Sequence, residues 1–145
     1  MSSLPNDAAA AALLDRMFEA EFGFMSSPDD GLDQLAEIFH VDCRIYEPAS
    51  LPYAGVWHGL AGVAKLIRSM GQAWSDMAIE KRTATLSGDM LYMRCNLSLT
   101  ARETGVTLTQ PFAEVLRLAD DRVIEGTPFY FDTCALTAAL AVKGL

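Results

Sequence analysis

The sequence predicts an α+β fold, in which a curved antiparallel sheet wraps over N-terminal helices and forms a cone-shaped cavity. Apolar residues recur with the helical period of 3.6 before residue 40 and again over residues 59–71. From residue 77 the period changes to 2, and short Gly- and Asp-containing turns separate long strands. Helices in one part of the chain and consecutive strands in another are typical of α+β proteins. A bent sheet folded over helices leaves a hollow, which is a common small-molecule site.

The N-terminal part is expected to form two helices after a frayed segment, residues 1–6. In the first helix, from Asp7, an apolar face contains a single polar residue, Glu21. Ser27 can cap a second helix, because Pro28 suits its first position and Asp30 follows three residues later. Its inward face is expected to include Leu32, Leu35, Ala36 and Phe39.

The stretch 41–59 is the most informative part of the chain. Residues 41–47 read as a strand that breaks at Glu47-Pro48, followed by a loop and a helix over 59–71. Alternation along the strand places Val41, Cys43, Ile45 and Glu47 on one face. A carboxylate in phase with apolar residues either reaches water at the strand end or lines a pocket, and the pattern leaves both open.

The rest of the chain reads as an antiparallel meander and a closing helix. Strands are expected over 77–86, 90–100, 107–118 and 122–131, joined by tight turns. A short helix over 134–142 follows, with Asp132 or Thr133 as its cap. The length of 145 residues suits one domain, 1–145.

Composition disfavours several classes of function. No apolar run reaches the ~18 residues of a membrane span, and no secretory signal is recognisable, so we expect no membrane partner and a cytoplasmic location. A net charge of −8 disfavours nucleic acid. Three scattered cysteines without a CxxC pair, and two histidines, disfavour a metal site.

Three stretches resemble the nuclear transport factor 2-like superfamily, and within it the SnoaL-like and ketosteroid isomerase-like proteins. They are LAEIFHVDCRIYEPASLPYAGVWHGLAGVAKLI, FAEVLRLADDRVIEG and PFYFDT. The resemblance implies the cystatin-like fold, a hydrophobic small molecule in the cavity, no cofactor and a homodimer. It does not select a function, because this fold hosts isomerases, cyclases, hydrolases, dehydratases and non-catalytic modules.

The carry-over from ketosteroid isomerases is partial. Their general base is an acidic residue directly before a proline in the first loop, which matches Glu47 here. Their protonated carboxylic acid precedes an apolar-Arg-apolar run on a later strand, which matches Glu114 approximately. Their oxyanion tyrosine lies on the first helix, where this chain has Phe18 and Phe22 and no tyrosine.

Two other branches of the superfamily match less completely. Limonene epoxide hydrolases use an Arg-x-Asp pair, which Arg94-Cys95-Asn96 resembles, although Asn96 cannot act as an acid. SnoaL-type cyclases need one base and one polarising group, for which the resemblance offers Glu47 or Asp132 with His58 or Arg94.

Each candidate also has a structural interpretation. Glu47 is a proton-abstracting base if an apolar hollow raises its pKa, or a strand-end residue paired with Arg44. Glu114 is a second acid whose proximity would separate the two pKa values, or a partner of Arg117 on the outer face. Asp132 is catalytic or a helix cap.

The remaining candidates are expected to line a ligand site or the surface around it. His58 is a neutral donor or a loop residue at the cavity rim. Tyr53 and Trp57 flank Gly55 and are candidates for a pocket mouth. The full set of predicted ligand-lining residues is Tyr53, Trp57, Phe18, Phe22, Arg94, Asn96 and Tyr130, although the solvent side or a dimer interface suits Arg94 and Asn96 slightly better.

Two hypotheses therefore stand. In the first, the protein is a cofactor-independent isomerase, cyclase or dehydratase that uses carboxylate acid–base chemistry on a hydrophobic carbonyl compound. In the second, it is a ligand-binding or dimerisation module with no chemistry. Whether Glu47 and Glu114 face one cavity is the observation that discriminates between them.

Overall fold

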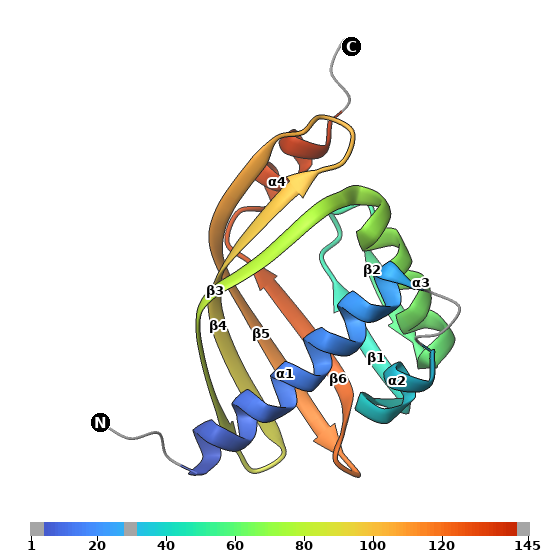
Figure 1. Ribbon diagram of the computed structural model, residues 1–145, viewed down its shortest axis with the longest axis vertical. Coiled ribbons are helices and arrows are strands. Elements are labelled where there is room, and N and C mark those ends of the chain that lie inside the picture. Colours follow the sequence, from blue (N-terminus) through green and yellow to red (C-terminus); the bar gives the residue numbers. More distant parts are fainter. Residues whose placement is uncertain (1–4, 28–31, 142–145) are drawn as a thin grey trace.

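The computed structural model describes residues 5–27 and 32–141, which form helices packed on a single curved sheet (Figure 1). The helices are α1 (Pro5–Ser26), α2 (Leu32–Ile38), α3 (Gly59–Ala73) and α4 (Thr133–Leu140). The strands are β1 (Phe39–Glu47), β2 (Gly55–His58), β3 (Trp74–Ser87), β4 (Met90–Ala101), β5 (Thr107–Ala119) and β6 (Arg122–Tyr130). This arrangement confirms the predicted α+β class.

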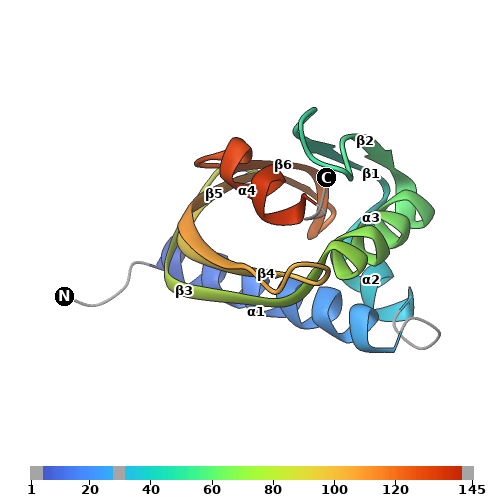
Figure 2. The ribbon, with the colours of Figure 1, turned by 90° about the horizontal axis from the view of Figure 1, so that it is seen from above.

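The strands form a six-stranded sheet in the order β2-β1-β6-β5-β4-β3. Four neighbouring pairs are antiparallel, but β1 runs parallel to β6, so the sheet is mixed. The parallel pair arises because the first strand of the chain adds beside the last strand of the meander. Seen from above, the sheet curls strongly between its two edges (Figure 2).

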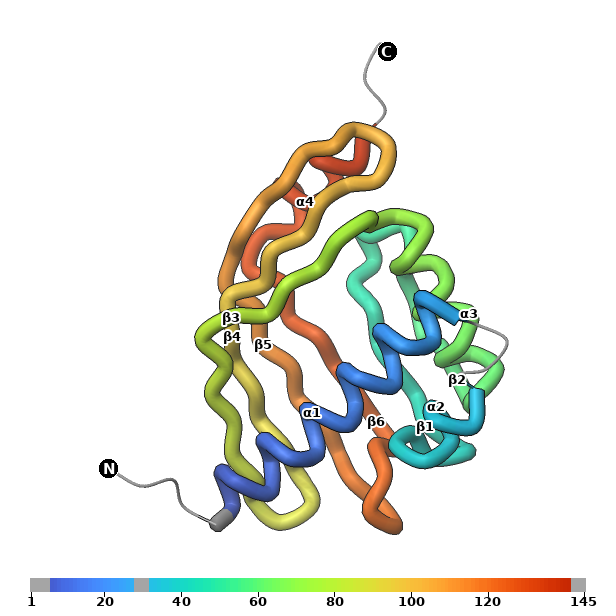
Figure 3. The backbone as a smooth tube through the Cα atoms, viewed as in Figure 1, coloured from blue at the N-terminus to red at the C-terminus, as the bar shows by residue number. Residues whose placement is uncertain are grey.

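The helices cover the concave side of this sheet. The long helix α1 crosses in front of the sheet and packs against β3, α2 and α3, while α3 packs against β1 (Figure 3). Apolar side chains of α1, such as Leu14 and Phe24, are fully buried there. The core therefore lies between α1, α3 and the inner face of the sheet.

The first half of the chain shows three departures from the sequence-based expectations. Helix α1 already includes Pro5 and Asn6, which were expected to be frayed. Phe39 begins β1 instead of ending a helix. Residues 55–58, expected as loop, form β2 against β1. The predicted helix restart at Pro28 and Asp30 lies outside the described residues.

The predicted alternation of buried and exposed side chains along β1 holds from Cys43 onward but not at Val41. Cys43 and Ile45 are buried, but Val41 is 65% exposed. The pairing of β1 with β6 shifts register between Phe39 and Arg44, and such an irregularity re-aims the side chains on one side of it. Val41 therefore points to water, while the segment that ends in Glu47 keeps its inward face.

Helix α4 is held at its start by polar contacts. The Asp132 carboxylate accepts a hydrogen bond from the Ala135 amide at 3.0 Å, which is the expected N-cap. The buried Gln110 side chain bonds both the Asp132 amide, at 3.1 Å, and the Asp132 carbonyl, at 3.2 Å. Asp132 is thus engaged in closing the fold.

Candidate functional site

A pocket lies between the concave face of the sheet and helices α1 and α3. Its volume is about 70 Å³, which is room for several water molecules, since one water needs about 10–15 Å³. The polar side chains of its lining are three glutamates and two tyrosines: Glu21, Glu47, Glu114, Tyr53 and Tyr130. Phenylalanine, methionine, leucine, isoleucine, valine and proline side chains form the rest.

Glu47 reaches the pocket from the end of β1, where its backbone pairs with Gly55 of β2. Its Oε1 atom is buried and has no hydrogen-bond partner among the described residues. Burial, and next the negative charge of Glu114, raise the pKa of Glu47 to about 8. The sequence left open whether the Glu47 carboxyl reaches water or lines a pocket, and the structure places it in the pocket.

Glu114 reaches the same pocket from the middle of β5, in phase with Phe112 and Leu116. Burial raises the pKa of Glu114 to about 7. Gly126 on β6 lies opposite Leu116, and a Cβ at Gly126 would stand 2.9 Å from Ile45 Cδ1 and 3.2 Å from Leu116 Cδ2. The missing side chain at this position thus allows the strands beside Glu114 to pack closely.

Glu21, on α1, is a third pocket acid that the sequence analysis did not assign to the site. Burial, followed by the charges of Glu114 and Glu47, raises the pKa of Glu21 well above its ordinary value of 4.5. The available signal was its position as the one polar residue on an apolar helical face. Periodicity alone could not show that this face borders a pocket instead of solid core.

Two tyrosines and a tryptophan form a hydrogen-bonded chain at one side of the pocket. The Trp74 indole N–H donates to the Tyr53 hydroxyl at 3.0 Å, and the Tyr53 and Tyr130 hydroxyls lie 3.4 Å apart. Indole is only a donor, so the Tyr53 oxygen accepts the Trp74 hydrogen bond. The Tyr53 O–H can then donate a hydrogen bond to the Tyr130 oxygen, which leaves the Tyr130 O–H free to donate elsewhere. Burial raises the pKa of Tyr53 to about 12 and that of Tyr130 well above 10.0, so both stay protonated.

The structure divides the sequence-predicted residues into two groups. Glu47, Glu114, Tyr53, Tyr130, Phe18 and Phe22 line the pocket. The other five do not. Asp132 caps α4, and Trp57 donates its indole N–H to the Tyr53 carbonyl at 3.0 Å. His58 lies exposed beside a separate surface groove with Arg44 and Arg117.

Arg94 and Asn96 lie on the outer face of β4. Their neighbours Met93, Cys95 and Leu97 are buried, so strand alternation directs Arg94 and Asn96 the opposite way. This is the alternative that the sequence analysis left open for them. Arg94 therefore does not stand near the pocket acids, and neither it nor Asn96 is in place to polarise a ligand there.

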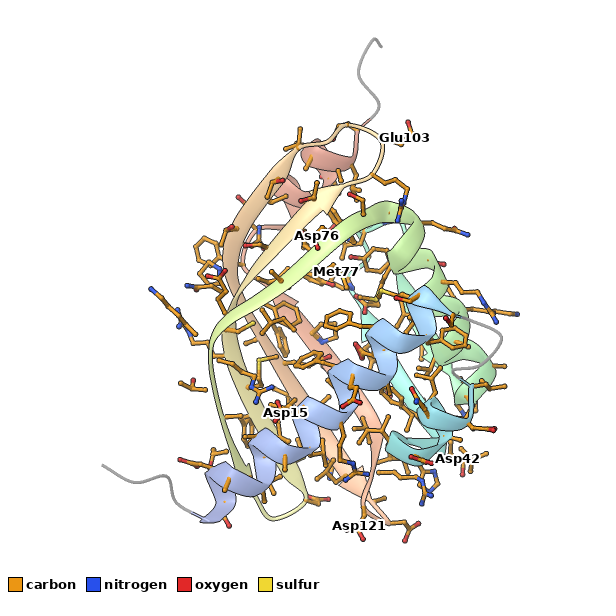
Figure 4. The ribbon with its side chains drawn as sticks, viewed as in Figure 1. Asp15, Asp42, Asp76, Met77, Glu103 and Asp121 are labelled. Atoms are coloured by element: carbon orange, nitrogen blue, oxygen red, sulfur yellow. The ribbon has the colours of Figure 1, made fainter. Side chains whose placement is uncertain are left out.

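An open groove adjoins the pocket between the end of α1, α3 and β3. Phe22, Ile67 and Met77 belong to the linings of both, so these side chains separate the groove from the pocket. Figure 4 labels Met77 and its neighbour Asp76 on β3 beside the space between that strand and α1.

Two further findings concern metals and membranes. Within residues 5–27 and 32–141, no cluster of three or more His, Cys, Asp or Glu side chains is arranged to hold a metal ion. In the same part of the chain, no helix combines the length and the apolar character needed to cross a membrane.

Comparison with known proteins identifies relatives of the whole architecture. A family model described as the SnoaL-like domain matches residues 14–126. A protein from Jannaschia sp. CCS1, described as a SnoaL-like polyketide cyclase, has a similar structure, with a TM-score of 0.74, 17% identity, and coverage of 99% of both chains.

Two more solved structures are similar. A nuclear transport factor 2-like protein of unknown function from Burkholderia pseudomallei K96243 has a TM-score of 0.71 at 21% identity, covering 90% of this chain and 98% of that one. IdmH from Streptomyces antibioticus, described as a polyketide cyclase, has a TM-score of 0.66 at 19% identity, covering 92% and 99%. No curated protein matches the sequence. At these identities the structural similarity supports the fold.

Proposed function

Because this chain belongs to the SnoaL-like domain family, we propose that its pocket binds a small, mainly apolar carbonyl compound and transfers a proton on it without a cofactor. The observation that carries the proposal is the pair of glutamates, Glu47 and Glu114, buried in one pocket with apolar walls. Such walls raise a carboxyl pKa toward neutrality, where proton abstraction beside a carbonyl is efficient.

The two acids would act in different protonation states. Burial raises both pKa values, to about 8 for Glu47 and about 7 for Glu114, and the charge on Glu114 further opposes ionisation of Glu47. Near neutral pH this favours a pair in which one carboxyl group is ionised and the other is protonated. The ionised member of the pair is the base, and the protonated member is the acid.

In the proposed reaction, the ionised carboxylate of the pair removes a proton from the carbon next to the substrate carbonyl. The electron pair moves to the carbonyl oxygen, which receives hydrogen bonds from the protonated glutamate of the pair and from the Tyr130 hydroxyl. Returning the proton to a different carbon gives isomerisation. Attack of the enolate on a second carbonyl gives cyclisation, and loss of a β-hydroxyl as water gives dehydration.

The test uses a simple apolar ketone and needs no knowledge of the natural substrate. Cyclohexanone in D2O exchanges its α-protons when a base removes them, and NMR follows the loss of the proton signal. We expect the wild-type protein to accelerate exchange. The exchange rate with Glu114→Gln or Glu47→Gln should be at least about tenfold lower than with the wild type. Glu103→Gln is the matched control, since Glu103 lies in the turn beyond β4, far from the pocket (Figure 4).

Equal rates for all four proteins would contradict the acid–base function. If cyclohexanone then still shifts NMR signals of pocket residues, the protein is better described as a ligand-binding module of the same fold. This outcome separates the two hypotheses that the sequence analysis left standing.

A homodimer is a second proposal, and it rests on the outer face of the sheet. Tyr92 of β4 is 46% exposed and Phe129 of β6 is 54% exposed. They flank Ala113 and Val115 of β5, because Tyr92 pairs with Val115 and Ala113 pairs with Phe129. An apolar band across a solvent-facing sheet favours burial against a second copy.

A further inference from the structure

The pocket has an unbalanced charge composition. Among the described residues, its lining contains Glu21, Glu47 and Glu114 but no arginine, lysine or histidine. The arginines that form ion pairs in the described residues do so elsewhere, Arg82 with Asp15 and Arg117 with Asp89 and Glu125. A buried carboxyl group is either paired with a cation or donors, or is kept neutral by a raised pKa, so a cation that enters this pocket would meet acids without a positive partner.

One atom shows the missing partner directly. Oε1 of Glu47 is buried without a hydrogen bond among the described residues, although buried polar atoms of native proteins nearly always have one. The side chains around it are mainly apolar, and neither hydroxyl of the pocket lining, that of Tyr53 or that of Tyr130, bonds to this oxygen. A hydrogen-bond donor on the ligand would supply the partner.

We propose that the ligand of this pocket carries a protonated amine on an apolar body, with the ammonium group bonded to Glu47 and to a second pocket glutamate. An ammonium group brings three N–H donors and no acceptor, so it suits carboxyl oxygens better than a hydroxyl does. Its apolar body would lie against Phe18, Phe22 and Phe112. An anionic ligand would meet three acids and is disfavoured.

This inference deepens the proposed function, on which it rests only in taking the same pocket as the ligand site. It narrows the substrate class from apolar carbonyl compounds to those that also carry a basic nitrogen. It does not require turnover.

A cation would also change the ionisation of the pocket. The titratable groups that face it are Glu21 on α1, Glu47 on β1, Glu114 on β5, Tyr53 in the loop after β1, and Tyr130 on β6. Burial and mutual repulsion keep the glutamates partly protonated near neutral pH. A bound ammonium favours their charged form, so binding of the amine should release protons, whereas binding of a neutral ligand should not.

The test compares three probes of nearly equal size: benzylamine, benzyl alcohol and benzoate. Isothermal titration calorimetry at about pH 7 measures each affinity, and two buffers with different ionisation enthalpies reveal proton release. We expect benzylamine to bind at least about tenfold more tightly than benzyl alcohol, with proton release, because charge-assisted hydrogen bonds are about twice as strong as neutral ones. We expect benzoate to bind most weakly. Equal or tighter binding of benzyl alcohol or benzoate would overturn the proposal.

A double variant, Glu47→Gln/Glu114→Gln, should lose the preference for benzylamine, and the Glu103→Gln control should keep it. If the double variant does not fold by circular dichroism, the wild-type protein still decides. The ratio of benzylamine to benzyl alcohol affinity should rise between about pH 6 and pH 8, as the glutamates ionise while the amine stays charged. A flat or falling ratio would overturn the proposal.

The amine-binding test and the cyclohexanone exchange test can fail independently of each other. Cyclohexanone exchange with no amine preference leaves the acid–base function standing and removes this inference. Amine preference with no exchange supports this inference and removes the catalytic function.

Discussion

Replacing Glu47 by glutamine should make the fold less sensitive to high pH. The pKa of Glu47 rises from an ordinary 4.5 to about 8 on folding, so the folded state holds a proton that the unfolded state has already lost. For an acid with a raised pKa, the folded state is most favoured at low pH. That advantage is lost as the pH rises from 4.5 through about 8.

The size of the effect follows from the two pKa values. A difference of one in pKa corresponds to about 1.36 kcal/mol. The rise in the pKa of Glu47 from 4.5 to about 8 therefore corresponds to about 5 kcal/mol of the free energy of unfolding. Between about pH 6 and pH 8 the unfolded Glu47 is ionised throughout, while the folded residue passes from protonated to half ionised. The wild-type free energy of unfolding should then fall by about 2 kcal/mol from this residue alone.

Urea unfolding followed by the fluorescence of Trp57 and Trp74 measures this loss at the two pH values. With an m value of about 1–3 kcal/mol/M, the wild-type midpoint should fall by about 0.7–2 M urea. The Glu47→Gln midpoint should fall by distinctly less, and Glu103→Gln should follow the wild type. The reasoning would be refuted if wild type and Glu47→Gln showed the same pH dependence.

Three further outcomes are expected. Asp132→Ala should lower the free energy of unfolding in urea by about 1 kcal/mol, because the α4 cap is lost. The affinity for benzyl alcohol should not change, and a changed affinity would argue that Asp132 reaches the pocket. Trp74→Phe removes the donor to the buried Tyr53 hydroxyl and should lower the free energy of unfolding by at least about 1 kcal/mol, and an unchanged midpoint would count against the hydrogen-bonded chain. Phe129→Asp should convert a wild-type dimer to a monomer in light scattering coupled to size exclusion, because it places a charge in the exposed apolar band. A wild type that is already monomeric at micromolar concentration would contradict the dimer.

Local pattern was sufficient for most of the secondary structure and for part of the site. Strand alternation left Glu114 either as a pocket acid or as a partner of Arg117 on the outer face, and β5 places it in the pocket. The strand break at Glu47-Pro48 predicted a carboxyl at the end of an apolar face, and that carboxyl lines the same pocket. Both predictions depend only on the two-residue period of a strand.

Local pattern was insufficient where a contact joins distant segments. Val41 shares the period of Cys43, but the irregular pairing of β1 with β6 turns it to water. In the sequence, Glu21 is one polar residue on an otherwise apolar helical face. No residue near it in the chain reveals that β1 and β5 bring Glu47 and Glu114 into the same pocket. His58 pairs with Arg44 of β1, yet it lies on the other surface of the sheet from the pocket.

By itself, the sequence determined the α+β class, the family, and the apolar faces that carry Glu47 and Glu114, since each of these depends on residues close together in the chain. Tertiary structure decided which polar residues meet. The curl of the sheet and the crossing of α1 bring Glu21, Glu47 and Glu114 from three separate elements into one apolar pocket. Burial in that shared pocket raises the pKa values of all three glutamates, and the charges of neighbouring acids raise those of Glu21 and Glu47 further.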